Sequence, residues 1–64
     1  MRILLIDDDA MFVDNLSSML RKKGFQTDVA VNGDDGLAQK EIYDYQVIIL
    51  DLDLPDIDGQ KLLS

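Results

Sequence analysis

The chain has 64 residues with 13 acidic and 6 basic side chains, a formal net charge of −7, and neither cysteine nor histidine. This length allows one small domain with a marginal core, and the lack of cysteine excludes disulfides and thiolate–zinc sites as a supplement. The acidic balance argues against direct binding to nucleic acid or to an anionic membrane surface, and without a membrane span or a signal peptide we expect a cytoplasmic protein.

The first predicted elements are a strand and a helix. An apolar strand over residues 2–6 ends in three consecutive aspartates that begin at Asp7. Apolar residues then recur at helical spacing over about residues 10–23. These apolar positions are Phe12, Val13, Leu16, Met19 and Leu20. Basic residues in the last turn and Gly24 directly after it are typical of a helix C-terminus.

An alternating stretch over residues 25–31 predicts a half-exposed strand at the edge of a sheet. One face would carry Phe25, Thr27, Val29 and Val31, and the other Gln26, Asp28 and Ala30. A turn at residues 32–34 leads into a short helix over about residues 34–42, with Asn32 or Asp34 as its cap. The side chains that this helix is expected to bury are Leu37, Ala38 and Ile42.

A third strand is predicted over about residues 45–50. Its continuous apolar run ends in Asp51 and is typical of a strand buried on both faces. A loop over residues 51–59 follows, and a helix begins near Gln60. The order strand, helix, strand, helix, strand indicates an α/β fold with parallel strands and right-handed crossovers.

Acidic residues follow both the first and the third strand. In an open α/β sheet, ligands bind just beyond the carboxyl ends of the strands. If these two strands are parallel neighbours, Asp7, Asp8 and Asp51 crowd one cleft, and they repel one another unless a cation is bound. A site with oxygen ligands alone selects a hard ion, here Mg²⁺. Such a site can orient a phosphoryl group for attack by Asp51.

Two stretches, residues 3–8 and 48–59, resemble the receiver domain of two-component response regulators. The acidic pair after the first strand and the spacing Asp51-x3-Pro55-x3-Gly59 match that family, and the element order agrees over all 64 residues. The resemblance implies a flavodoxin-like (CheY-like), doubly wound parallel sheet with strand order 2-1-3. It also implies that residues 1–64 are the N-terminal half of a receiver domain.

The resemblance further implies how the acidic residues divide their roles. Asp51 is the expected phosphoacceptor, Asp8 a direct Mg²⁺ ligand and Asp7 a ligand through water. Asp53 is expected to offer its backbone carbonyl to the same ion. A receiver of this kind is a signalling domain that assists its own phosphorylation and is not an enzyme in its own right.

Partners are implied in the same way. Pro55 and Gly59 would shape the loop, while Ala10, Met11 and Asp14 are candidate contacts for a sensor histidine kinase or a phosphotransfer protein. The family also has two further strands, which carry a Ser or Thr and a Lys that bind the phosphoryl oxygens. Because those strands are absent here, we expect a truncated domain that does not switch alone. Any DNA-binding output domain would belong to a longer protein.

Other hypotheses stay open on the sequence alone. The three aspartates from Asp7 onward could merely cap the first helix. The apolar edge of the third strand predicts a non-catalytic module that forms homo-oligomers through that edge. A phosphatase of the haloacid dehalogenase type would use Asp51 as nucleophile and Asp53 as general acid and base, but it leaves the acidic pair at Asp7 and Asp8 unexplained.

Overall fold

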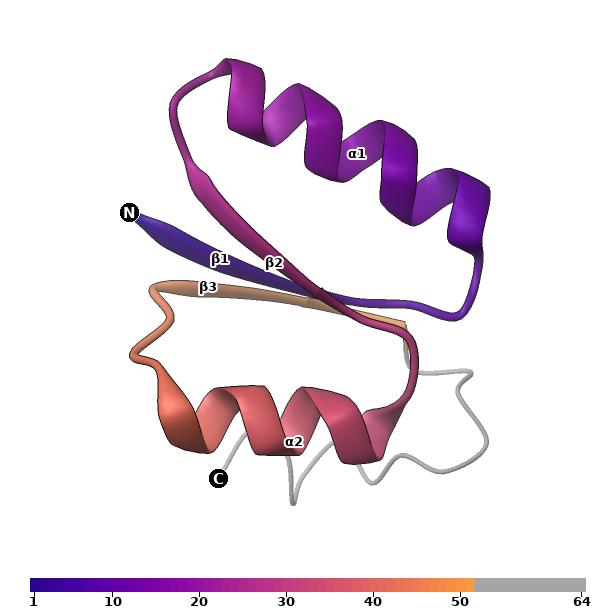
Figure 1. Ribbon diagram of the computed structural model, residues 1–64, viewed down its shortest axis with the longest axis vertical. Helices are drawn as coiled ribbons and strands as arrows, with labels where there is room; N and C mark the ends of the chain where they lie inside the picture. The colour runs from indigo at the N-terminus through magenta and orange to yellow at the C-terminus, as the bar shows by residue number, and fades with distance from the viewer. Residues whose placement is uncertain (52–64) are drawn as a thin grey trace.

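The computed structural model describes residues 1–51, in which three parallel strands lie between two helices (Figure 1). The elements are β1 (Arg2–Ile6), α1 (Ala10–Lys22), β2 (Gln26–Ala30), α2 (Gly33–Ile42) and β3 (Val47–Leu50). This order confirms the predicted α/β class. The predicted loop after Asp51 and the helix from Gln60 lie outside the described residues. Neither α1 nor α2 is long and apolar enough to cross a bilayer.

The sheet has the predicted strand order, β2-β1-β3, with β1 in the centre. Ile6 at the end of β1 stands opposite Ala30 of β2 and Leu50 of β3. The ladders continue beyond the strands, because Asp7 N–H donates to Ala30 O at 3.1 Å and Asp51 N–H to Ile6 O at 3.0 Å. The carboxyl ends of all three strands therefore meet at one edge of the sheet (Figure 1).

The core is built around β1, whose Leu4, Leu5 and Ile6 are fully buried. Because side chains alternate along a strand, β1 packs α2 on one face and α1 on the other. The cluster on the α2 face consists of Leu4, Ile6 and Ala30, with Leu37, Tyr45, Ile48 and Leu50 partly buried against it. Each fully buried aliphatic side chain contributes about 1.5–3 kcal/mol to folding, so β1 is the main source of stability.

The apolar face of α1 is only partly covered. Val13 is buried as predicted, but Phe12 and Met19 remain 46% and 49% exposed. The main contacts of α1 are with β1 and β2, which leaves the outer part of its apolar face open. Ser17 is also buried, and its hydroxyl donates to Asp14 O at 3.2 Å. The helix ends as predicted before Gly24, whose φ of 93° lies in the left-handed region.

The prediction for the buried face of α2 is largely wrong. Leu37 is partly buried, but Ala38 is exposed and Ile42 is 67% exposed. The residues that α2 buries are two glycines, Gly33 and Gly36. At Gly36 a Cβ would overlap Ile6 Cδ1, so the helix backbone itself lies against the end of β1.

The edge position of β2 is confirmed, but its predicted two-faced pattern is not. Ala30, assigned to the polar face, is 3% exposed because it packs under α2. Val31 lies beyond the strand and is 52% exposed. Thr27 is buried as expected. The small side chains of Thr27 and Ala30, on opposite faces of β2, are therefore both buried although β2 is an edge strand.

Candidate metal centre

Three carboxylates meet at the carboxyl edge of the sheet. Asp7 and Asp8 follow β1, and Asp51 follows the neighbouring strand β3. One carboxylate oxygen from each residue lies within 4.8 Å of the other two. Asp7 and Asp51 are half-buried and Asp8 is exposed. The in-register pairing of Ile6 with Leu50 produces this convergence, because the residue after each strand then occupies the same level.

The third aspartate of the run has a different role. Asp9 is the N-cap of α1, and its Oδ1 accepts the N–H of Phe12 at 3.1 Å. Its own N–H donates to Asp7 Oδ1 at 3.0 Å. Asp9 therefore caps the helix, whereas Asp7 and Asp8 lie in the carboxylate cluster with Asp51. The hydrogen bond from Asp9 fixes one oxygen of Asp7.

The donor set of this cluster suits a hard divalent cation. All three groups are carboxylates, hard oxygen donors that suit Mg²⁺ and similar hard ions. Two oxygens bound to one Mg²⁺ lie at most about 4.2 Å apart, twice the length of the Mg–O bond. Oxygens within 4.8 Å of one another reach this spacing by small side-chain rotations or through a bridging water. The residues present therefore fit the ion.

The remaining predicted site residues divide into two groups. Asp53, Pro55 and Gly59 lie outside the described residues. Ala10, Met11 and Asp14 are exposed on the first turns of α1, directly after the capping residue. Met11 is 76% exposed, so this end of α1 offers an apolar side chain next to the carboxylates.

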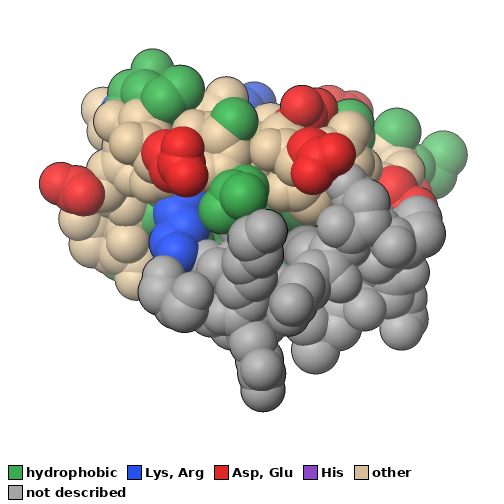
Figure 2. All heavy atoms as spheres, turned by 90° about the horizontal axis from the view of Figure 1, so that it is seen from below, with side chains coloured by type: hydrophobic (Ala, Val, Ile, Leu, Met, Phe, Trp, Pro, Cys, Tyr) green, Lys and Arg blue, Asp and Glu red, His purple; other side chains and the backbone are tan. Residues whose placement is uncertain are grey.

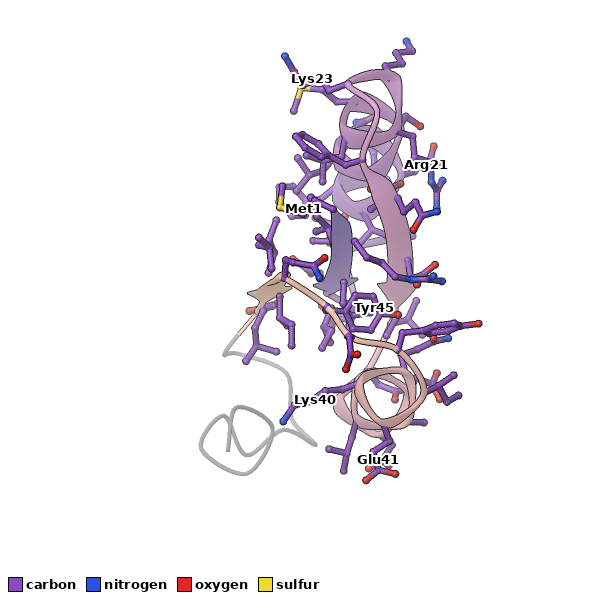
Figure 3. The ribbon with its side chains drawn as sticks, turned by 90° about the vertical axis from the view of Figure 1, so that its left-hand side faces the viewer. Met1, Arg21, Lys23, Lys40, Glu41 and Tyr45 are labelled. Carbon is purple, nitrogen blue, oxygen red and sulfur yellow. The ribbon has the colours of Figure 1, made fainter. Side chains whose placement is uncertain are left out.

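A polar cluster at the opposite edge of the sheet was missed by the sequence analysis. We call it the Asp28 cluster, and it consists of Arg2, Asp28, Tyr43 and Tyr45. Arg2 Nε and the Tyr45 hydroxyl both donate to Asp28 Oδ2, at 2.9 and 2.6 Å. The Arg2 guanidinium carbon lies 3.7 Å from the ring centroid of Tyr43. Figure 3 shows Tyr45 between the sheet and α2.

The Asp28 cluster shifts the pKa of its members. Partial burial pushes the pKa of Asp28 upward, but hydrogen bonds from Tyr45 and Arg2 and the charge of Arg2 outweigh burial, so the pKa lies below 3.8. Burial and the hydrogen bond to Asp28 raise the pKa of Tyr45 from 10.0 to about 12. The hydrogen bond to Asp28 also raises the pKa of Arg2. The sequence signal that could have revealed this cluster is Asp28, a charged residue in the middle of a predicted strand.

Acidic side chains are scattered over the visible surface. On the face seen from below, acidic side chains outnumber basic ones and stand apart from one another (Figure 2). This distribution agrees with the net charge of −7. Such a surface attracts cations over a distance of about 10 Å at moderate ionic strength, which favours delivery of a divalent ion to the carboxyl edge.

Comparison with known proteins identifies the family. Residues 3–64 match the sequence model of the response regulator receiver domain. Among curated proteins, the "Cell cycle response regulator CtrA" of Brucella ovis, Brucella anthropi and Brucella canis is in each case 38% identical over 63 residues. These matches cover 98% of this chain but 27% of each relative, so the chain spans about a quarter of their length. Together with the parallel β2-β1-β3 sheet, this match shows that the chain belongs to the family of response regulator receiver domains.

Proposed function

We propose that Asp51 accepts a phosphoryl group from a sensor histidine kinase or a phosphotransfer protein, with Mg²⁺ held by Asp7, Asp8 and Asp51. The observation that carries this proposal is the approach of three carboxylates to within 4.8 Å, at the carboxyl edge of a receiver-family sheet. Ligands of open α/β sheets bind at this edge. Asp53 completes the proposed ligand set through its backbone carbonyl.

The chemistry follows from the position of Asp51. A carboxylate oxygen of Asp51 forms a bond to the phosphorus of a phosphohistidine. The P–N bond breaks, and its electron pair stays on the imidazole nitrogen, so the product is an acyl phosphate. Bound Mg²⁺ would neutralise charge on the phosphoryl oxygens. Asp8 would bind the ion directly and Asp7 through water, while the hydrogen bond from Asp9 to Asp7 holds that carboxylate in place.

The kinase or phosphotransfer protein is proposed to dock on the start of α1. Ala10, Met11 and Asp14 support this proposal, because they are exposed and lie close in the chain to Asp7 and Asp8. Pro55 and Gly59 are proposed to shape the loop after Asp51. We also propose that residues 1–64 are the first half of a receiver. Because the match covers only 27% of each Brucella relative, a DNA-binding output domain is proposed to belong to a longer protein.

Mass spectrometry after incubation with Mg²⁺ and acetyl phosphate tests the phosphoacceptor. We expect one added phosphoryl group on the wild-type chain and none on Asp51→Asn. Asp8→Asn should lower the extent of modification by at least about tenfold, as expected for loss of a metal ligand. Asp44→Asn is the matched control, because it makes the same change in charge at an exposed residue between α2 and β3. Equal modification of the wild type and Asp51→Asn would contradict the proposal.

A second candidate function is self-association through β3. Among residues 1–51, β3 pairs with β1 alone, and Val47 at its start is 37% exposed. An apolar strand with an open edge can pair with another copy. Sedimentation at micromolar concentrations should then show a dimer that Val47→Lys dissociates, and a wild-type monomer would rule it out. The phosphatase alternative loses its basis, because the family match is to receivers.

A further inference from the structure

Among residues 1–51, β3 is less well covered than β1. Both helices make their main contacts with β1 and β2, and none of the four residues of β3 is fully buried in the part of the chain that the structure describes. Its ladder with β1 runs over four residue pairs. By contrast, β1 is paired on both sides and packed on both faces. The position of β3 relative to β1 therefore depends more than usual on anchors outside the ladder.

Two anchors hold the chain where it enters β3. Gln46 N–H donates to Arg2 O at 3.0 Å, and Arg2 N–H donates to Gln46 Oε1 at 2.7 Å. Tyr45 reaches across β1, and its hydroxyl donates to Asp28 Oδ2 of β2 at 2.6 Å. The same hydroxyl oxygen lies 3.3 Å from Oε1 of Gln39 in α2. Tyr45 thus ties the start of β3 to the far strand of the sheet and to the helix beneath it.

The other end of β3 carries the proposed phosphoacceptor. Asp51 follows the last residue of the strand, about 20 Å from Tyr45 at the usual rise of a β-strand. Its N–H is bonded to Ile6 O, and its carboxylate meets those of Asp7 and Asp8. Those two partners are carried by β1. Any slip of β3 along β1 therefore moves Asp51 and leaves the rest of the carboxylate cluster in place.

We propose that Tyr45 is a positioning residue for Asp51. By bonding to Asp28 on the opposite edge strand, the Tyr45 hydroxyl fixes the start of β3 and so holds Asp51 beside Asp7 and Asp8. The metal-binding part of this inference rests on the proposed function. The positional part rests on the hydrogen bonds alone and can be tested without metal.

Amide hydrogen exchange in Tyr45→Phe gives the first test, because this variant keeps the ring and loses the hydroxyl. Two amides at the same edge report on the two ladders: Asp51 N–H bonds to β1, and Asp7 N–H bonds to β2. We expect exchange at Asp51 to accelerate about fivefold more than at Asp7, the size of one partly exposed charge-assisted hydrogen bond. Equal acceleration at both amides would mean a general loss of stability and would overturn the inference.

Two further variants serve as a control and as a second test of this result. Tyr43→Phe, on the neighbouring ring, should leave the ratio of the two exchange rates unchanged within about twofold. Asp28→Asn keeps the shape of the acceptor and removes its charge, so it should shift the ratio in the same direction as Tyr45→Phe by a smaller factor. If Tyr45→Phe does not fold, Asp28→Asn decides, and an unchanged ratio in that variant would overturn the inference.

Calorimetric titration with Mg²⁺ gives the second test. Tyr45→Phe should weaken Mg²⁺ binding about fivefold in the wild-type background and less than about twofold in Asp51→Asn, because the effect acts through Asp51. An equal loss in both backgrounds would contradict this coupling. A wild-type chain that binds no Mg²⁺ would contradict the proposed function, while the ratio of exchange rates would still decide the role of Tyr45.

Discussion

Neighbouring aspartates in the loop between β1 and α1 differ in what their carboxylates bind. One carboxylate oxygen of Asp9 accepts a hydrogen bond from the N–H of Phe12, and the N–H of Asp9 donates to the carboxylate of Asp7. Asp8 is exposed at the same edge as Asp51. A charge count treats the three residues as equal, whereas their hydrogen bonds separate a helix cap from two candidate metal ligands. Substitutions in this run should therefore have different effects on stability and on metal binding.

The cap is tested by two substitutions at Asp9 that remove the same charge. Asp9→Ala should lower the free energy of unfolding by about 1 kcal/mol, because the N–H of Phe12 loses its acceptor. Asp9→Asn keeps an acceptor oxygen and should change the free energy of unfolding by no more than a few tenths of a kcal/mol. Urea unfolding measures both changes in the free energy of unfolding, provided that its dependence on urea concentration is the same in all variants. Equal destabilisation by Ala and Asn would show that charge, not capping, is the role of Asp9.

Tyr45 gives the fold a dependence on alkaline pH. The folded chain keeps the phenolic proton up to a pKa of about 12, whereas the unfolded chain loses it near 10.0. Stability from this proton is complete below pH 10.0 and is lost as pH rises toward about 12. Urea unfolding across this pH interval should show that the free energy of unfolding declines in the wild type. The decline should be smaller in Tyr45→Phe and as large as in the wild type in Tyr43→Phe. Identical declines in all three chains would contradict this assignment.

At the scale of elements, α2 is unusual because it packs through glycine. Gly33 and Gly36 are three residues apart and lie on the same side of the helix, which lets the backbone approach β1 closely. The apolar Ile42, at the other end of the helix, is left exposed. This close approach also brings the start of α2 to the carboxyl edge of the sheet.

Gly36→Ala tests the close approach. In a helix, Ala is favoured over Gly by about 1 kcal/mol, yet here its Cβ would overlap the side chain of Ile6. We expect a net destabilisation of about 1–2 kcal/mol, since overpacking a closed core outweighs the gain in propensity. Ile6→Val removes Cδ1, so the double variant should be more stable than the sum of the two single changes predicts. Simple additivity in urea unfolding would refute the steric explanation.

The sequence predicted where helices and strands lie better than it predicted which of their side chains are buried. The bounds of β1 and α1 follow from apolar runs and caps. Strand order was implied by the resemblance to receivers, and with that order Asp7, Asp8 and Asp51 were expected to lie together. Burial in α2 was predicted from Ile42, but the helix packs on glycines, which carry no hydropathy signal. The Asp28 cluster joins side chains from β1, β2 and the entry to β3. Its contacts depend on the sheet register, which local patterns do not define.

At the scale of the whole molecule, the net negative charge bears on the proposed metal site. A net charge of −7 on 64 residues weakens the compact state by self-repulsion, and the convergence of three carboxylates concentrates that repulsion at one edge. Monovalent salt screens the repulsion among all charges of the molecule, but it does not bind between the three carboxylates. A divalent cation bound at the carboxyl edge would reduce both the overall repulsion and the repulsion among the three carboxylates.

Thermal unfolding in Mg²⁺ and in NaCl at equal ionic strength separates these two effects. Salt alone should raise Tm modestly in all variants. Mg²⁺ should add a further gain that grows with the logarithm of its concentration above Kd and reaches about 2.7 kcal/mol at a hundred times Kd. Asp8→Asn and Asp51→Asn should lose this extra gain, and Asp44→Asn should keep it. The same gain in every variant would indicate non-specific screening.

The central place of β1 has a consequence for synthesis. β1 leaves the ribosome before either strand that pairs with it, and residues 7–25 separate it from β2. At about 5–20 residues per second, its apolar segment waits about 1–4 s for its first partner and longer for β3. Until then Ile3 to Ile6 are without the neighbours that bury them in the native sheet. Among residues 1–51, this short apolar segment is therefore the first that the nascent chain presents to any chaperone that binds extended hydrophobic peptides.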